Sequence, residues 1–124
     1  MQLQDFYVLT GGDFAAVKGR FFKEEMIERF VLRFLEDPSF GELSRALEGK
    51  TVTEAFRAAH TLKGVCSNLG FDRLGNSSSE LTEYLRGREQ ALVDWEQCRL
   101  LFGKVAEDYG QVTETIRQLD SYMA

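Results

Sequence analysis

The sequence is poor in the residues from which metal centres are built. Among 124 residues there are two cysteines and one histidine, and no C-x-x-C motif occurs. A structural zinc site uses four such ligands, so we expect no metal site. Cys66 and Cys98 both fall on apolar faces of predicted helices, where free cysteine usually acts as a small hydrophobe. The same scarcity leaves His60 as the single imidazole in the chain.

Long apolar runs and an excess of basic charge are also missing. Uninterrupted apolar runs reach only about four residues, which predicts no membrane span. The N-terminus lacks the basic and apolar regions of a secretory signal peptide, which favours a soluble, cytoplasmic protein. Fifteen basic and twenty acidic residues give a net charge of −5, which argues against nucleic acid as a partner. The sequence also lacks a G-x-x-x-x-G-K-[ST] phosphate loop.

A single proline permits long helices, and the N-terminal third predicts several shorter ones. A first short helix is expected over residues 3–9, before a break at Gly11 and Gly12. Asp13 is the expected N-cap of a second short helix that runs to about Lys18.

Two further helices are expected on either side of the proline. Apolar residues at spacings of three and four predict an amphipathic helix over residues 23–36. Asp37 is then the expected N-cap of a helix that ends near Gly49. Pro38 takes the first helical position, where its missing N–H costs nothing.

The middle of the chain predicts a helix that ends at Leu69. Thr51 and Glu54 have the spacing of a capping box, in which both side chains satisfy backbone donors at the helix start. Gly70 is expected to supply the left-handed residue that closes the helix.

Two helices are expected in the C-terminal half. The first shows one apolar face, formed by Leu74, Ser78, Leu81 and Leu85, and ends at Gly87. The second has a seam with alternating spacings of three and four, formed by Trp95, Cys98, Phe102, Val105, Tyr109, Val112, Ile116, Leu119 and Met123. Gly103 and Gly110 are interpreted as points of close helix packing on this last helix.

These segments predict an all-α fold. The short connections favour an antiparallel up-and-down four-helix bundle, with the short N-terminal helices as a cover. The length suits a single domain over residues 1–124, with the core bundle over about residues 20–122.

His60 is expected to point away from the bundle core. The apolar stripe of its helix consists of Ala55, Ala59, Leu62, Cys66 and Leu69. At about 100° per residue this stripe spans roughly 80° of arc, and His60 lies about 140° from its centre. Cys66 lies 240° around the helix from His60, so the two cannot form a nucleophile–base pair within it. A solvated surface histidine is the simplest alternative to a functional one.

The residues that share the face of His60 favour a functional role. They are Thr53, Phe56, Arg57, Lys63, Gly64 and Ser67. Gly64 stands in mid-helix, where glycine costs about 1 kcal/mol relative to alanine, and it leaves room beside the imidazole. Lys63 brings a compact cation suited to phosphate oxygens. Phe56 is interpreted either as part of an apolar docking patch or as buried beneath an N-terminal helix.

The run from His60 to Gly70, HTLKGVCSNLG, resembles the signature H-x-L-K-G-x-x-x-x-x-G of histidine-containing phosphotransfer (HPt) domains. The stretch Leu-Thr-Glu-x-Leu-Arg over residues 81–86 is also similar to this family. The resemblance implies a four-helix phosphocarrier rather than an enzyme, in which His60 takes a phosphoryl group from a receiver-domain phospho-aspartate and passes it to another receiver.

The same resemblance assigns expected roles to the neighbours of His60. Lys63 would hold the phosphoryl oxygens, Gly64 would leave space for the ring and the receiver, and Gly70 would close the helix. Phe56, Arg57 and Ser67 are expected to belong to the receiver-binding surface because they share the face of His60. The chain itself would carry no cofactor, because Mg²⁺ is expected in the receiver partner. The implied partners are response-regulator receiver domains and, as a further candidate, a hybrid histidine kinase, with this chain acting as a monomer.

Two other functions compete with the carrier. One is a non-catalytic helical module that only binds receivers. The intact His60, Lys63 and Gly64 argue against it, because a degenerate scaffold would be free to lose them. The other is the dimerisation and phosphoacceptor module of a histidine kinase. That module works with an ATP-binding domain, which these 124 residues have no room for, and forms its bundle from two chains, whereas this sequence predicts four main helices in one copy.

Overall fold

The computed structural model describes residues 1–123, with side chains as far as Leu119. These residues form seven α-helices and two short 3-10 segments, without a strand. The α-helices are α1 (Leu3–Thr10), α2 (Phe14–Phe21), α3 (Glu24–Arg33), α4 (Ser39–Glu48), α5 (Val52–Leu69), α6 (Asp72–Leu85) and α7 (Trp95–Met123). The 3-10 segments are η1 (Phe34–Glu36) and η2 (Gln90–Leu92). The all-α prediction is confirmed.

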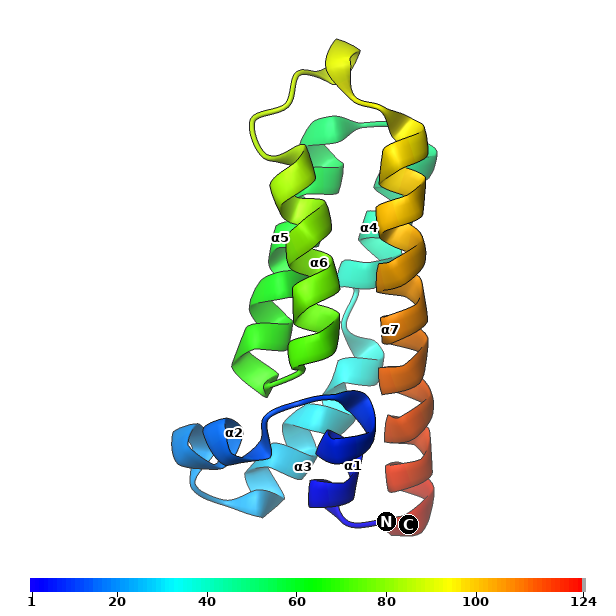
Figure 1. Ribbon diagram of the computed structural model, residues 1–124. Coiled ribbons are helices and arrows are strands. Elements are labelled where there is room, and N and C mark those ends of the chain that lie inside the picture. Colours follow the sequence, from blue (N-terminus) through cyan, green and yellow to red (C-terminus); the bar gives the residue numbers. More distant parts are fainter. Residues whose placement is uncertain (124) are drawn as a thin grey trace.

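Helices α4 to α7 form an antiparallel bundle. The chain rises through α3 and α4, descends in α5, rises in α6 and descends along the whole molecule in α7 (Figure 1). Helix α5 packs between α4 and α6, while α7 packs against α6 and α4. At the lower end of Figure 1, α1 packs against α7 and α2 against α3. The predicted up-and-down bundle with short N-terminal cover helices is therefore confirmed.

The N-terminal cover contributes to the core as well as shielding it. The largest fully buried side chains come from nearly every helix, and they are Phe6, Tyr7, Ile27, Phe34, Leu43, Leu62, Phe71, Leu74, Leu81, Leu85, Ile116 and Leu119. Phe71, which follows α5, makes edge-on contacts with Phe6 of α1 and Phe34 of η1, with ring centroids 5.7 and 5.1 Å apart. One aromatic cluster thus joins the cover helices to the end of α5.

Asp13 caps α2 as predicted, whereas the predicted start of α4 is wrong by one residue. Pro38, expected at the first helical position, is the N-cap residue, and Asp37 precedes it but still binds the start of the helix through its carboxylate. The Asp13 carboxylate accepts a hydrogen bond from the Ala16 N–H at 3.0 Å, and Asp37 accepts one from the Ser39 N–H at 2.9 Å. Between α3 and α4 the helix expected over residues 23–36 tightens into η1 before Pro38. A carboxylate therefore satisfies free backbone donors at each of these two helix starts.

The capping box predicted at the start of α5 is wrong. Thr51 is the N-cap residue, but its hydroxyl donates to the Gly49 carbonyl at 3.4 Å. The Val52 N–H instead donates to Gln90 Oε1 at 2.9 Å, and Gln90 Nε2 donates to the Lys50 carbonyl at 2.5 Å. The side-chain amide of Gln90, in η2, therefore binds the backbone at the start of α5, the role that the capping-box prediction gave to Thr51 and Glu54.

Gly70 closes α5 as predicted, and the N-terminal segment covers this end. Gly70 has φ +72°, in the left-handed region. The Tyr7 hydroxyl donates to the Leu69 carbonyl at 2.6 Å, and the Asp13 N–H donates to the Gly70 carbonyl at 3.0 Å. The Arg20 guanidinium donates to the Ser67 carbonyl at 3.2 Å. Residues far earlier in the chain therefore satisfy the carbonyl groups at the C-terminal end of α5.

The seam predicted on α7 is confirmed as far as Leu119. Cys98, Val105, Val112, Ile116 and Leu119 are buried, and the three aromatic positions of the seam are half-buried. Met123, the last predicted member, lies outside the described side chains.

The predicted packing role of Gly103 and Gly110 is wrong. Both are exposed, and a methyl group on either one would meet no other described atom within 4 Å. Each glycine directly follows an aromatic residue of the seam, Phe102 or Tyr109. One residue corresponds to about 100° around the helix, so the glycines lie on a face turned away from the neighbouring helices. Their spacing of seven correctly places them on one face, but that face is open to solvent.

Replacing Gly70 by alanine is expected to lower the free energy of unfolding more than replacing Gly87. Both residues have positive φ, +72° and +64°, where a residue with a side chain pays about 1–2 kcal/mol. At Gly70 the new methyl carbon would also clash with Val17 Cγ2, whereas at Gly87 it would meet no described atom within 4 Å. Urea denaturation measures both losses, and equal losses would contradict the importance of the Val17 contact.

Alanine at Gly103 or Gly110 is expected to stabilise the protein. Each replacement adds a methyl group to open space in the interior of a long helix, where alanine is favoured by about 1 kcal/mol over glycine. Chemical denaturation followed by circular dichroism measures the gain in the free energy of unfolding. Destabilisation by either alanine would show that this face of α7 is covered.

Candidate functional site

Helix α5 divides into a buried face and an exposed face. Its buried residues are Val52, Ala55, Ala58, Ala59, Leu62, Cys66 and Leu69. His60 is exposed on the opposite face, as the helical phase predicts. Gly64, one turn further along, is exposed beside it. The helix thus packs with one side into the bundle and presents the only histidine of the chain on the other.

Phe56 holds the His60 ring from one side. The two rings are nearly parallel, with an interplanar angle of 9° and centroids 5.8 Å apart. Phe56 is half-buried against the core, so it is a firm support for the exposed imidazole. A parallel contact of this kind uses the face of the imidazole and not its edge, which carries both ring nitrogens.

The alternative burial of Phe56 beneath an N-terminal helix is wrong. The Arg86 guanidinium, directly after α6, lies over the Phe56 ring with its central carbon 5.1 Å from the ring centroid. The half-burial of Phe56 therefore comes from its own helix and from the end of α6, and the ring remains part of the surface around His60.

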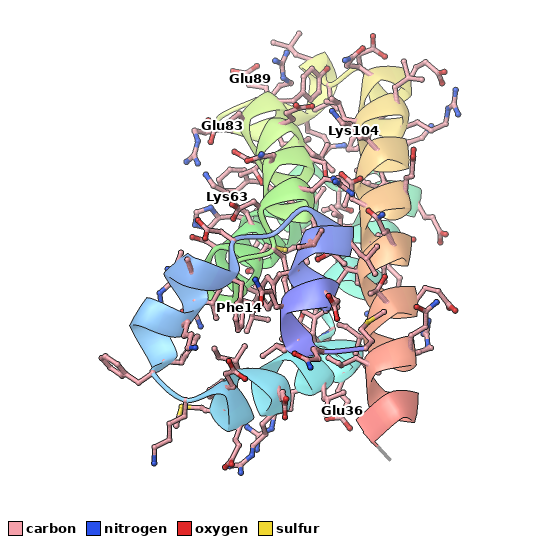
Figure 2. The ribbon with its side chains drawn as sticks, turned by 60° about the horizontal axis from the view of Figure 1, so that its bottom comes forward. Phe14, Glu36, Lys63, Glu83, Glu89 and Lys104 are labelled. Atoms are coloured by element: carbon pink, nitrogen blue, oxygen red, sulfur yellow. The ribbon has the colours of Figure 1, made fainter. Side chains whose placement is uncertain are left out.

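A group of three charged side chains lies beside His60. Lys63 Nζ is 3.9 Å from Glu83 Oε1, and Figure 2 shows these two side chains next to each other on the outer side of α5 and α6. Both oxygens of Glu83 accept hydrogen bonds from Arg86, from Nε and from Nη2, each at 3.0 Å. Glu83 thus contacts both Lys63, which is expected to hold a phosphoryl group, and Arg86, which lies over Phe56.

The electrostatics of Glu83 reflect these neighbours. The hydrogen bond from Arg86 lowers the pKa of the Glu83 carboxyl, and the nearby charges of Arg86, Lys63 and His60 lower it further. The same hydrogen bond raises the pKa of Arg86. Glu83 is therefore ionised at neutral pH, and it lies close enough to His60 for the charge of the imidazole to affect its titration.

Gly64 leaves an opening beside the imidazole. A methyl group built at this position would meet no described atom within 4 Å. Because Gly64 follows His60 by four residues, this bare stretch of backbone lies directly below the ring on the same face. Another molecule can approach the ring here more closely than along the rest of the helix.

The structure places Arg57 and Ser67 on different sides of the exposed face. Arg57 lines a shallow hollow between α5 and α4, together with Glu42 and Thr61. Ser67 lines a hollow between α5 and α6, on the same side as Lys63. The two residues therefore line different hollows on either side of α5.

Sequence reasoning missed the roles of Glu83 and Arg86. Both occur in the stretch over residues 81–86 that resembles the family, but the sequence alone assigned neither residue to the site. Their separation of three residues at the end of α6 is compatible with the Glu83–Arg86 ion pair. Their closeness to Lys63 and Phe56 depends on the antiparallel packing of α6 on α5, which the spacing within either helix does not show.

The chemistry available at this surface is that of one imidazole with a nearby ammonium group. Cys66 and Cys98 are buried, and burial raises the pKa of both thiols, so neither is a nucleophile at neutral pH. None of the helices within residues 1–123 combines the length and the apolar character needed to cross a membrane. Among the described residues, the side chain of His60 is therefore exposed, whereas both cysteine thiols are not available for reaction at the surface.

Comparison with known proteins gives one match. The family model described as the Hpt domain matches residues 22–122 of the 124-residue chain. The matched region begins after α2 and includes the whole of α3 to α6 and nearly all of α7. No match was found among curated proteins or among solved structures.

Proposed function

The chain belongs to the Hpt domain family, and from this premise we propose that it is a phosphorelay carrier. His60 accepts a phosphoryl group from a receiver-domain phospho-aspartate and passes it to the aspartate of another receiver. Membership of the family implies a role in phosphotransfer, and the position of His60 supports this residue as the acceptor. The observation that carries the proposal is one exposed imidazole, stacked on Phe56, with Lys63 beside it and open space at Gly64.

The proposed step is an in-line displacement at phosphorus. A lone pair on an imidazole nitrogen of His60 forms the nitrogen–phosphorus bond while the phosphorus–oxygen bond of the aspartyl phosphate breaks. The electron pair of the broken bond leaves with the aspartate carboxylate. Transfer of this kind depends mainly on positioning and charge neutralisation, because its transition state is loose. Phe56 provides the positioning, and the ammonium group of Lys63 supplies positive charge to the phosphoryl oxygens.

The proposed partners are response-regulator receiver domains, with hybrid histidine kinases among the candidate donors. Receivers would bring Mg²⁺ and the acidic residues that hold it, so this chain needs no cofactor of its own. We therefore propose a phosphocarrier and not an enzyme. The bundle of α4 to α7 lies within one chain, which supports a monomer, and the proposed relay places the protein in the cytoplasm.

Replacing His60 by glutamine is expected to abolish phosphotransfer while leaving the fold intact. The side chain is exposed, so its loss removes the acceptor nitrogen without opening a cavity. Radiolabelled, phosphorylated receivers with Mg²⁺ are incubated with both proteins, and the label is followed as an acid-labile adduct. Labelling of the glutamine variant would contradict the assignment of His60. Receiver binding without transfer from any donor would favour the non-catalytic module.

Replacing Gly64 by alanine is expected to stabilise the fold and to slow transfer. The methyl group meets no described atom in this chain, so the helix gains about 1 kcal/mol. On the exposed face next to His60, however, the same group stands where a receiver must approach the ring. Initial rates of transfer from a phosphorylated receiver and urea denaturation measure the two effects separately.

The matched control for this experiment is Gly103→Ala. Gly103 is also an exposed mid-helix glycine with open space around it, but it lies on α7, away from α5. We expect Gly103→Ala to raise stability by a similar amount with an unchanged transfer rate. Equal transfer rates for the two alanine variants would contradict a close approach of the receiver at Gly64.

A further inference from the structure

The cation that the proposed function assigns to the phosphoryl group already has a partner. In the unphosphorylated chain Lys63 Nζ lies 3.9 Å from Glu83 Oε1, on the neighbouring helix. Glu83 is held in turn by Arg86 through two hydrogen bonds of 3.0 Å. Because the Arg86 guanidinium also lies over the Phe56 ring, Glu83 is anchored to the same aromatic side chain that supports His60.

Phosphorylation would change the charge balance of this group. A phosphoryl group carries close to two negative charges at neutral pH, and His60 would bring it beside the Glu83 carboxylate. Lys63 is then between two anions and can neutralise only part of their combined charge. The contacts of Phe56 place the two groups on one surface, because this ring stacks on His60 and lies under Arg86, which holds Glu83.

We propose that Glu83 is a positioning residue that sets how readily phospho-His60 gives up its phosphoryl group. It keeps Lys63 close to the imidazole before transfer, and it repels the phosphoryl group afterwards. The repulsion raises the free energy of the phosphorylated state, so the group is passed on more readily. This inference rests on the proposed function and deepens it, because a carrier must release its phosphoryl group as well as accept it.

The loose transition state gives the repulsion a kinetic effect. As the nitrogen–phosphorus bond breaks, the departing phosphoryl group carries less negative charge near the imidazole than the bound group did. A fixed carboxylate therefore destabilises the phosphohistidine more than the transition state. Loss of this carboxylate should slow the breakdown of phospho-His60.

The test measures this breakdown without a receiver. Purified full-length protein is phosphorylated with phosphoramidate, a small-molecule donor. The nitrogen–phosphorus bond of the donor breaks, ammonia leaves, and a bond forms between phosphorus and an imidazole nitrogen of His60. After removal of the donor, the oxygen of a water molecule bonds to phosphorus while the nitrogen–phosphorus bond breaks. The ring nitrogen keeps the electron pair of that bond, one water proton passes to the imidazole, and the other leaves on hydrogen phosphate. The half-life of the adduct is followed by phosphorus NMR.

Replacing Glu83 by glutamine is expected to lengthen the half-life about three- to tenfold, the range expected for the loss of one partly screened charge on the same surface. Because salt screens exposed charges, 1 M NaCl should reduce the difference between wild type and variant. Glu83→Asp keeps the charge, so its half-life should stay near that of the wild type. A purely structural role for Glu83 would produce neither the salt dependence nor the rescue by aspartate.

Glu80→Gln is the matched control. Glu80 also belongs to α6 and pairs with a lysine, Lys104, at 3.8 Å, and its exposure of 54% is close to the 53% of Glu83. Its partner lies on α7, and Figure 2 shows Lys104 on the opposite side of α6 from Lys63. We expect the half-life of the Glu80→Gln adduct to equal that of the wild type.

The outcomes separate this inference from the proposed function. If the half-lives of the Glu83→Gln, Glu80→Gln and wild-type adducts agree, the role of Glu83 is wrong and the carrier function is untouched. If the glutamine variant at residue 83 loses its phosphoryl group faster, Glu83 stabilises the adduct and the inference is reversed. The carrier function fails instead when phosphorylated receivers leave His60 unlabelled.

Discussion

Helix α5 is held at both ends by groups that are distant in the sequence, and this constraint sets the direction of His60. Gln90 binds the backbone at its N-terminal end. Tyr7, Asp13 and Arg20 bind the last carbonyl groups at the other end. A helix fixed at both ends and buried along one side cannot easily rotate about its axis, because rotation would expose its apolar stripe and break both sets of bonds. The outward direction of the imidazole therefore follows from the way the whole helix is held, and Phe56 adds a contact with the ring.

In the proposed carrier, the charges around the imidazole serve two states of the protein, with and without a phosphoryl group on His60. In a chain with a net charge of −5, the cations near His60 have acidic competitors, and Glu83 is one that the fold brings into contact with both Lys63 and Arg86. Without a phosphoryl group, Glu83 keeps these two cations ordered and offsets their charge. With a phosphoryl group on His60, the Glu83 carboxylate would compete with the phosphoryl oxygens for Lys63. The Lys63–Glu83 ion pair would thus order the site before transfer, but the same pair would weaken the hold of Lys63 on the phosphoryl group afterwards.

The sequence predicted what depends on local periodicity and missed what depends on packing between helices. The phase of α5, the seam of α7, the carboxylate cap at Asp13, and the closing residue Gly70 all follow from spacings within one turn or a few turns. The capping box at Thr51 failed because Gln90, 38 residues later, competes for the same backbone donor. Gly103 and Gly110 were misplaced because a repeat of seven fixes a common face but not which face is covered. Glu83 reaches the site only through the register between α5 and α6.

The region that matches the family is smaller than the physical unit that supports the site. The match begins at Phe22, yet Phe6 and Tyr7 are among the largest fully buried side chains. The Tyr7 hydroxyl is bonded to the Leu69 carbonyl, and burial raises its pKa, so the phenol stays protonated and remains a donor at neutral pH. Tyr7 binds the C-terminal end of α5, and α5 carries His60. The N-terminal segment therefore helps to hold the helix that orients His60. The family match covers the positions that its members share, and these include His60. In this chain, part of the packing that orients them comes from Phe6 and Tyr7, which precede the matched residues.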